Sequence, residues 1–172
     1  MPNANSRQAK APPKSKCLCE TLVVLLSAPA LAADFSGRVV RVIDGDSIVV
    51  LRNGKAEQVR LNGIDCPELG QPFGRRAKQF TFNLVFGKEV SVEELGRDHY
   101  GRTIGEVTLD GKSLNLELVR AGYAWWYRED APRDRILKRL ESEARDVRRG
   151  LWVDPSPIPP WEFRKLHRND IR

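Results

Sequence analysis

Four carboxylates and two arginines have residue types and spacings that suit chemistry on phosphate esters. They are Asp44, Asp46, Arg60, Asp65, Glu68 and Arg102. Hard divalent cations prefer oxygen ligands, and a bound dication can polarise a phosphate and position water. A further carboxylate can take a proton from that water, while arginine binds phosphate through two parallel hydrogen bonds. The set therefore meets the needs of phosphodiester hydrolysis.

Each of these residues also has a simpler interpretation. Asp44-Gly45-Asp46 is typical of a tight turn between two strands, because Asp-Gly is favoured there for its backbone angles. That interpretation leaves the second carboxylate unexplained, since it concentrates negative charge that water or a cation must offset. Asp65 and Glu68 could form an acidic surface loop, and Arg60 and Arg102 could be solvated.

The segment VRLNGIDCPE places three of these residues at the end of a predicted strand. Arg60 lies on the opposite face of this strand from its apolar neighbours. Pro67 fixes the backbone and favours an extended Cys66, so Asp65 and Glu68 emerge from a stiff turn.

Apolar patterns predict the elements that must position these residues. Short segments rich in Val and Ile predict strands at 35–43, 47–51, 57–64, 88–95 and 103–109. Helical spacing predicts helices at 71–86, 113–121 and 131–149, and the prolines from Pro155 onward predict an irregular tail. The order predicts a β-barrel with helices (α+β): a five-stranded OB-fold barrel plus three α-helices. A mixed α+β sandwich is the alternative.

Length and charge set weaker bounds. A chain of 172 residues suits one domain with its own core. Its formal net charge is +6, but half of that charge lies in residues 1–32. Net charge is therefore weak evidence for a nucleic-acid partner.

The first 32 residues predict a signal peptide. A basic stretch precedes the apolar run TLVVLLSAPALA, and Ala30-Leu31-Ala32 fits the small-x-small cleavage pattern. The run is shorter than the roughly 20 residues that span a bilayer, and the alternatives are an uncleaved anchor or a disordered arm. Cleavage would leave Cys66 as the remaining cysteine, without an internal disulfide. We expect an exported protein, periplasmic or secreted, that is monomeric and has no stable membrane association after cleavage.

Five segments together resemble the staphylococcal nuclease-like (thermonuclease) domain family. They are VIDGDSIVV, VRLNGIDCPE, HYGRTIGEV, LNLELVRAGYA and EARDVRRGLW, in the family's order and at compatible spacings over 35–152. The most specific part is Arg-x-x-x-x-Asp-x-Pro-Glu followed by Tyr-Gly-Arg. The resemblance implies the same five-stranded barrel with three helices. With the residue patterns at both ends, we expect a signal peptide at 1–32, the nuclease-like domain at 34–153 and a Pro-rich basic C-terminal tail at 154–172.

The resemblance implies a calcium site. Asp46 and Asp65 would bind Ca²⁺ directly, and the backbone carbonyl of Cys66 would be a further ligand. Asp44 would lie at the edge of the site, in contact through water.

The resemblance also implies the catalytic and substrate-binding residues. Glu68 would be the general base for the attacking water. Arg60 and Arg102 would hold the scissile phosphate and stabilise the charge that develops on it. Tyr100 would lie at the nucleotide pocket, and Tyr127 belongs to an aromatic run that either packs in the core or stacks on bases.

Four departures from the family pattern are visible. Ser47 replaces the usual Thr and keeps its hydroxyl, and Cys66 replaces a Thr of which the backbone carbonyl alone is needed. His99 stands where a lysine often precedes Tyr-Gly-Arg. The loop over 69–76 is shorter than the mobile loop of the best-known member.

The resemblance implies calcium-dependent endonuclease activity on DNA and RNA with little sequence preference, leaving 3′-phosphate ends. The alternative is a non-catalytic OB-fold module that binds nucleic acid or protein. A third possibility, an exported structural domain with an acidic patch, leaves the two arginines unexplained.

Overall fold

The computed structural model describes residues 34–169 of the chain. The predicted signal peptide and its cleavage site, within 1–32, lie outside the described residues. Within 34–169, no helix is both long enough and apolar enough to cross a membrane.

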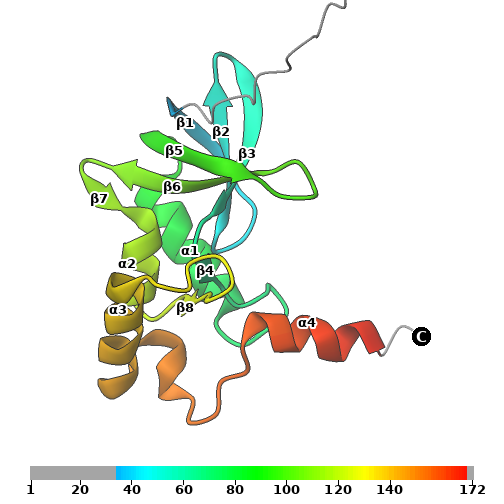
Figure 1. Cartoon of the computed structure of the whole chain (residues 1–172), viewed down its shortest axis with the longest axis vertical. Helices are drawn as coiled ribbons and strands as arrows, with labels where there is room; N and C mark the ends of the chain where they lie inside the picture. Colours follow the sequence, from blue (N-terminus) through cyan, green and yellow to red (C-terminus); the bar gives the residue numbers. More distant parts are fainter. Residues whose placement is uncertain (1–33, 170–172) are drawn as a thin grey trace, which may run out of the picture. The chain divides into compact units, whose positions relative to one another are not determined.

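Five strands form a closed barrel (Figure 1). They are β1 (Phe35–Val42), β2 (Ser47–Arg52), β3 (Lys55–Leu61), β5 (Glu89–Arg97) and β6 (Thr103–Leu109). Neighbours in the order β3-β2-β1-β5-β6 pair antiparallel, and a parallel pairing of β3 with β6 closes the ring. The short β7 (Lys112–Ser113) continues the sheet beyond β6. The predicted barrel is confirmed, and the sandwich alternative is wrong.

The turn between β2 and β3 follows from its sequence. Asn53 has a φ of 50° and Gly54 a φ of 77°. Two successive residues with positive φ are what a two-residue Asn-Gly hairpin requires, because this turn matches the twist of the strands.

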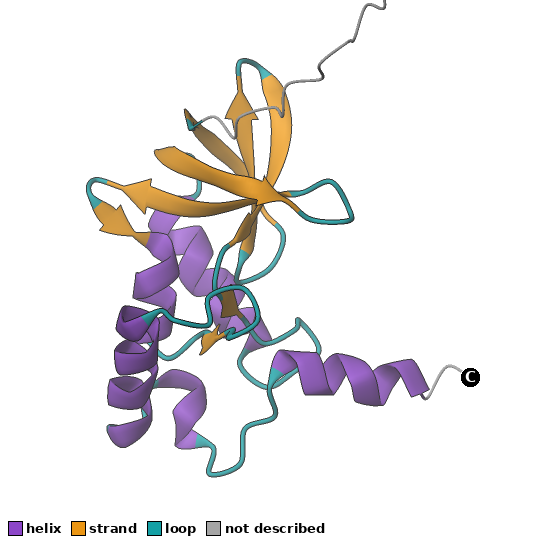
Figure 2. Ribbon diagram, viewed as in Figure 1, coloured by secondary structure: helices purple, strands orange, loops and turns teal. Residues whose placement is uncertain are grey.

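Three helices match the predicted ones. They are α1 (Gly74–Val85), α2 (Leu114–Arg120) and α3 (Arg135–Asp146). They gather at one end of the barrel, where α1 contacts β1 and α2 contacts β6, and α2 contacts α1 and α3 (Figure 2). Asp134 caps α3 by accepting hydrogen bonds from the backbone N–H groups of Ile136 and Leu137. The helix therefore begins at residue 135 rather than at the predicted 131.

A fourth helix, α4 (Pro160–Asn169), follows a 3₁₀ turn, η1 (Gly150–Val153). The prediction of an irregular tail is wrong from Pro160 onward. Proline is favoured in the first turn of a helix, because its missing N–H is not needed there. The Trp161 ring packs 5.7 Å from that of Trp125 and 5.5 Å from that of Tyr127, measured between centroids. Tertiary packing of this kind stabilises a helix too short to be stable alone.

Two apolar clusters hold these elements together. The larger one fills the barrel and lies under the helices, and it includes Val39, Ile48, Val50, Val59, Leu61, Val92, Val107, Leu118 and Trp126. The smaller one contains Trp125, Ala144, Leu151 and Trp152, with Phe73 and Trp161 packed against it. Because Trp125 and Trp126 are buried, this part of the aromatic run packs in the core rather than stacking on bases.

Candidate active site

Asp46 stands at the entrance of β2, where its carboxylate is held from several sides. Its Oδ2 accepts a hydrogen bond of 2.6 Å from the backbone N–H of Cys66, and its Oδ1 accepts one from the Ser47 hydroxyl. The side chain is 6% exposed. Ser47, which replaces the family's usual Thr, thus keeps a hydroxyl that orients the carboxylate.

Gly45 is required by close packing rather than by turn geometry. Its φ is not in the left-handed region, and a Cβ at this position would lie 2.7 Å from both Cβ and Sγ of Cys66 and 2.9 Å from the Cβ of Ala77. The Gly45 carbonyl also accepts a hydrogen bond of 2.6 Å from the Thr81 hydroxyl of α1. The predicted turn is confirmed, since residues 44–46 join the antiparallel strands β1 and β2, but its glycine is needed for packing and not for its backbone angles: Gly45 lets the β1–β2 loop lie directly on Cys66 and α1.

Asp65 is placed by a two-residue strand pair. It ends β4 (Ile64–Asp65), which pairs antiparallel with β8 (Trp125–Trp126), so that Asp65 lies opposite Trp125. Its side chain is 2% exposed. A carboxylate buried to this extent requires partners that offset its charge.

Arg60 joins the two buried acids. Its Nη1 pairs with Asp46 Oδ1, and its Nη2 lies 2.9 Å from Asp65 Oδ1. The guanidinium is held on β3 with its side chain 14% exposed, so it is not the solvated arginine of the simpler interpretation. One planar cation spans both carboxylates, which brings their oxygens to a common point.

The two acids of the Asp-Gly-Asp segment differ in charge. Burial and the neighbouring Asp46 raise the pKa of Asp44 to about 7. Burial also disfavours the charge of Asp46, but the Arg60 guanidinium and a hydrogen bond from Cys66 outweigh it and lower the pKa of Asp46. Asp46 is therefore ionised at neutral pH, whereas Asp44 is partly protonated and accepts a hydrogen bond from the backbone N–H of Asp46.

Glu68 lies on the loop between β4 and α1, and the loop is braced by Gln71. The Gln71 Oε1 accepts a 2.8 Å hydrogen bond from the Glu68 backbone N–H, and the Glu68 carbonyl accepts one from the Gln71 backbone N–H. A Cβ on Gly74 would lie 1.9 Å from the Glu68 carbonyl oxygen, so this glycine permits the close approach of α1. The Glu68 side chain is partly exposed, as a base that meets water must be.

Arg164 of α4 completes the cluster, and the sequence did not indicate it. Its Nη2 lies 2.8 Å from Asp65 Oδ2, and its Nη1 lies 2.7 Å from Glu68 Oε1. The one available signal was Pro160 followed by aromatic and basic residues, which is compatible with a short docked helix. Nothing local shows where such a helix points its side chains.

Arg102 and Tyr100 lie on the β5–β6 loop and have other partners. Arg102 Nε lies 2.6 Å from Asp98 Oδ2, and its guanidinium is 5.6 Å from the centre of the Tyr100 ring, which is 74% exposed. No hydrogen bond or ion pair in the described residues joins Arg102 to the four acids. It does precede β6, the strand that pairs with β3 beside Arg60.

Tyr127 makes two contacts within the protein, and its predicted role in substrate binding stays a prediction. Its hydroxyl donates a 2.6 Å hydrogen bond to Glu129 Oε2, and its ring packs near Trp161.

Comparison with known proteins places these residues in a family. The model of the family described as "Staphylococcal nuclease homologue" matches residues 58–154, which include Arg60, Asp65, Glu68 and Arg102. The chain belongs to this family. The resemblance found in the sequence is thereby confirmed.

The relatives of this staphylococcal nuclease homologue include proteins named as nucleases. An "Uncharacterized endonuclease" of Escherichia coli is 46% identical over 144 residues, which cover 83% of this chain and 94% of the relative. A "Micrococcal nuclease" of Shigella flexneri is 42% identical over 164 residues, covering 90% and 94%. "Protein ParB" of Escherichia coli is 41% identical over 158 residues, covering 86% and 89%. The coarser prediction, a protein of a nuclease family, is therefore confirmed.

The donor chemistry of the site fits a hard divalent cation. Asp46 and Asp65 are buried oxygen donors that already converge on one positive group, the Arg60 guanidinium. No group of three or more His, Cys, Asp or Glu side chains within 34–169 is arranged to hold a metal ion. A bound ion would therefore use these two carboxylates and complete its shell with carbonyl and water oxygens, a mixture that calcium accepts.

Proposed function

We propose that this staphylococcal nuclease homologue is a calcium-dependent endonuclease that hydrolyses DNA and RNA with little sequence preference and leaves 3′-phosphate ends. The observation that carries the proposal is the Arg60 guanidinium, which bridges Asp46 and Asp65. Arg164 in turn pairs with both Asp65 and Glu68 and so links Glu68 to the two acids. A folded protein has no structural need to bury two acids at one point, because ionised groups are costly to remove from water. The names of its relatives support the same class of reaction.

Each side chain of the cluster has a task in such a reaction. A bound divalent cation would offset the charge of the acids and polarise the phosphate. Arg60 would then turn its fork to a non-bridging phosphate oxygen, where it stabilises the negative charge that develops. Arg102 would do the same from the start of β6, after leaving Asp98.

Glu68 would accept the proton of the attacking water. The bond from the water oxygen to phosphorus forms as the bond from phosphorus to the 5′ oxygen breaks. The departing 5′ oxygen takes up a proton from solvent, which leaves the phosphate on the 3′ side and a 5′ hydroxyl. Exposure of Glu68 and bracing of its loop by Gln71 support this role, because a base must meet water yet stay in place.

A non-catalytic binding module is the second candidate. The same barrel could grip nucleic acid through its arginines alone. The presence of both buried acids and of Glu68 favours the enzyme, since a binding surface for a polyanion gains nothing from three carboxylates.

A cleavage assay tests the enzyme. We expect purified protein to cut circular plasmid and single-stranded DNA with added calcium and to stop with a calcium chelator. The fragments should accept phosphate at their 5′ ends directly, but should not be extended by a polymerase until a phosphatase removes the 3′ phosphate. Absence of cleavage with every divalent cation tried would refute the enzyme hypothesis and favour the non-catalytic binding module.

The role of Glu68 is tested by substitution. We expect Glu68→Ala to lower the cleavage rate by about a hundredfold or more, because general-base catalysis contributes about that much. Calcium and oligonucleotide binding should survive. Glu143→Ala is the matched control, since Glu143 is an exposed residue of α3. Equal rates for the Glu68 variant and the wild type would refute the role.

We propose further that the chain is exported to the periplasm or beyond, after cleavage behind Ala32, and is monomeric there. The charge pattern of residues 1–32 supports export. N-terminal sequencing of the protein from fractionated cells tests the cleavage site, and light scattering tests the monomer. A full-length N-terminus on protein from the cytoplasm would contradict export.

A further inference from the structure

Arg164 contacts both Asp65, a proposed calcium ligand, and Glu68, the proposed general base. Its guanidinium makes a fork-like pair with Asp65, through Nη2 to Oδ2 at 2.8 Å and Nη1 to Oδ1 at 3.3 Å. Its Nη1 also donates to Glu68 Oε1 at 2.7 Å. The family match ends at residue 154, so Arg164 lies outside the part of the chain that the family model describes.

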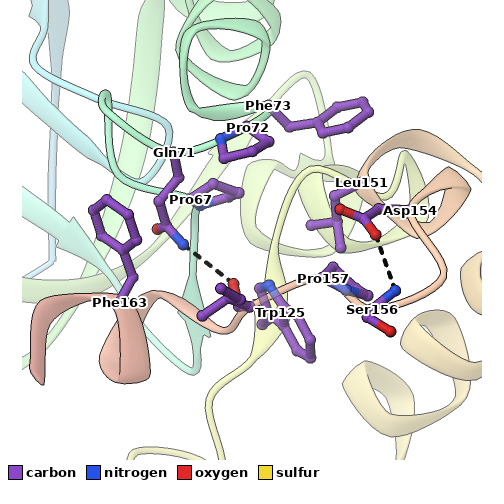
Figure 3. Close-up of a pocket in the computed structure, with 11 residues that line it drawn as sticks. Pro67, Gln71, Pro72, Phe73, Trp125, Leu151, Asp154, Ser156, Pro157 and Phe163 are labelled. Atoms are coloured by element: carbon purple, nitrogen blue, oxygen red, sulfur yellow. Dashed lines mark hydrogen bonds between the residues drawn. The ribbon is translucent and has the colours of Figure 1, made fainter. Parts of the chain in front are cut away.

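The helix that carries Arg164 is anchored at its start. Trp161 packs against Trp125 and Tyr127, and the Gln71 side chain donates a 3.1 Å hydrogen bond to the Ile158 carbonyl just before α4. Phe163 faces Pro67 and Gln71 across a cavity of about 130 Å³ (Figure 3). Gln71 also holds the backbone of Glu68, so the helix and the loop of the proposed base share one brace. The placement of Arg164 is therefore built by several contacts besides its own ion pairs.

The balance of charge around Arg164 would change when a divalent cation binds the acids. Asp46, Asp65 and Glu68 are offset by two guanidinium groups, those of Arg60 and Arg164. A divalent cation on Asp46 and Asp65 would offset the charge of Asp65 and weaken its attraction for Arg164, leaving Arg164 paired with Glu68 alone. The Arg164 side chain is 43% exposed, whereas that of Arg60 is 14% exposed, so less packing opposes rotation of Arg164 toward bound substrate. The anion it would meet there is phosphate, which its fork fits as it fits a carboxylate.

We propose that Arg164 of α4 is a third phosphate-binding arginine of the active site. Its guanidinium contacts the substrate backbone beside the scissile phosphate. The inference rests on the proposed function. It assigns part of the binding of nucleic acid to α4, which lies outside the barrel. The opposite role is an inhibitory one, in which Arg164 competes with the cation for Asp65 and leaves substrate binding untouched.

Oligonucleotide binding separates the two roles. The probe is a short fluorescein-labelled oligothymidylate at saturating calcium, with the protein carrying Glu68→Gln so that the probe stays intact. In this background we expect Arg164→Gln to raise the dissociation constant about tenfold, the loss expected for a charged hydrogen bond. The slope of log affinity against log salt should fall in magnitude by about 0.7, one phosphate contact on a single strand. The matched control is Lys165→Gln, which removes the same charge from the next residue of the helix and should change both quantities less.

Two further measurements secure the interpretation. Arg164→Lys should keep the salt slope of the parent protein and bind with intermediate affinity, because it retains the charge and loses the fork; this variant carries the test if Arg164→Gln does not fold. In a calcium titration without nucleic acid, Arg164→Gln should have the same affinity for calcium as the parent protein or a higher one. Unchanged oligonucleotide affinity and salt slope, with tighter calcium binding, would overturn the proposal and favour inhibition. Because these are binding measurements, a wild type that fails to cleave would sink the proposed function without deciding the role of Arg164.

Discussion

The close packing around Gly45 determines where Asp46 points. The loop before β2 lies on the Cys66 side chain and on Ala77 of α1, and no room remains there for a Cβ. This contact brings the Asp46 carboxylate to the Cys66 backbone N–H and, through Arg60, to Asp65. The glycine thus fixes the distance between the two proposed calcium ligands.

Substitution of this glycine should damage both stability and the site. We expect Gly45→Ala to lower the free energy of unfolding by about 1–3 kcal/mol, because the added methyl overpacks the contact. It should also weaken calcium binding, since Asp46 moves with the loop. Denaturant unfolding and calorimetric titration measure the two effects. Gly70→Ala is the control: its φ is not left-handed, and its Cβ would meet only Phe163, at 4.0 Å. Equal effects of the two substitutions would contradict the packing argument.

Part of the site was predictable from single residues and part was not. Asp46, Asp65 and Arg60 lie within 20 residues of one another on consecutive short elements, so their meeting follows from a strand meander. Arg164 meets Asp65 across 99 residues, and an ion pair of that range leaves no local pattern. The function of Gly45 was predicted for the wrong reason, because a sequence shows that a glycine is present but not which neighbour excludes a side chain.

Asn115 joins α2 to β6 and to the segment after β3. Its Oδ1 accepts a hydrogen bond from the Val107 N–H of β6, and its Nδ2 donates to the carbonyls of Asn62 and Gly105. The side chain is fully buried on α2. A buried amide that satisfies the backbone of β6 and of the segment after β3 fixes α2 across the closing pair of the barrel.

We expect Asn115→Ala to lower the free energy of unfolding by about 2–3 kcal/mol, because buried backbone groups lose their partner. Asn83→Ala is the control, since Asn83 is an exposed residue of α1 whose side chain accepts a hydrogen bond from the Gln79 side chain. Urea unfolding followed by circular dichroism measures both. A loss below about 0.5 kcal/mol, typical of surface substitutions, would show that Asn115 does not hold the elements together.

The regular elements were predictable because their patterns are local. Alternating Val and Ile residues, an Asn-Gly turn and helical spacing are read over a few residues, and the five strands and first three helices follow from them. The fourth helix follows a Pro-rich segment, and that composition predicts irregular structure. Its stability comes from Trp161 packing on Trp125 and Tyr127, which no local pattern contains.

Stability of the whole molecule should depend on pH through Glu106. Burial raises the pKa of this β6 residue from its ordinary value of 4.5 to about 7, and Asp134 and Glu93 add to the shift, while Asn62 and Ser113 oppose it. The folded protein therefore binds more protons at this group than the unfolded chain does between about pH 4.5 and 7. A raised carboxyl pKa means that its contribution to stability falls as the pH rises through this interval.

Glu106→Gln should remove this contribution. We expect the variant to gain about 1–2 kcal/mol relative to the wild type between pH 4.5 and 7.5, after allowance for partial exposure of the group. Thermal or denaturant unfolding at the two pH values measures the change. Glu143→Gln, on the surface of α3, removes the same charge and should show a much smaller difference. A gain that does not vary with pH would disprove the role of Glu106.

The 99-residue separation of Asp65 and Arg164 has a consequence for the time at which the protein becomes active. The ribosome synthesises Asp65 and Glu68 long before α4, so a nascent chain that has not yet reached α4 lacks one member of this cluster. The proposed nuclease would degrade the messenger that encodes it and the chromosome of its own cell. Late synthesis of Arg164 would give the producing cell an interval in which the chain is present without this proposed phosphate-binding arginine.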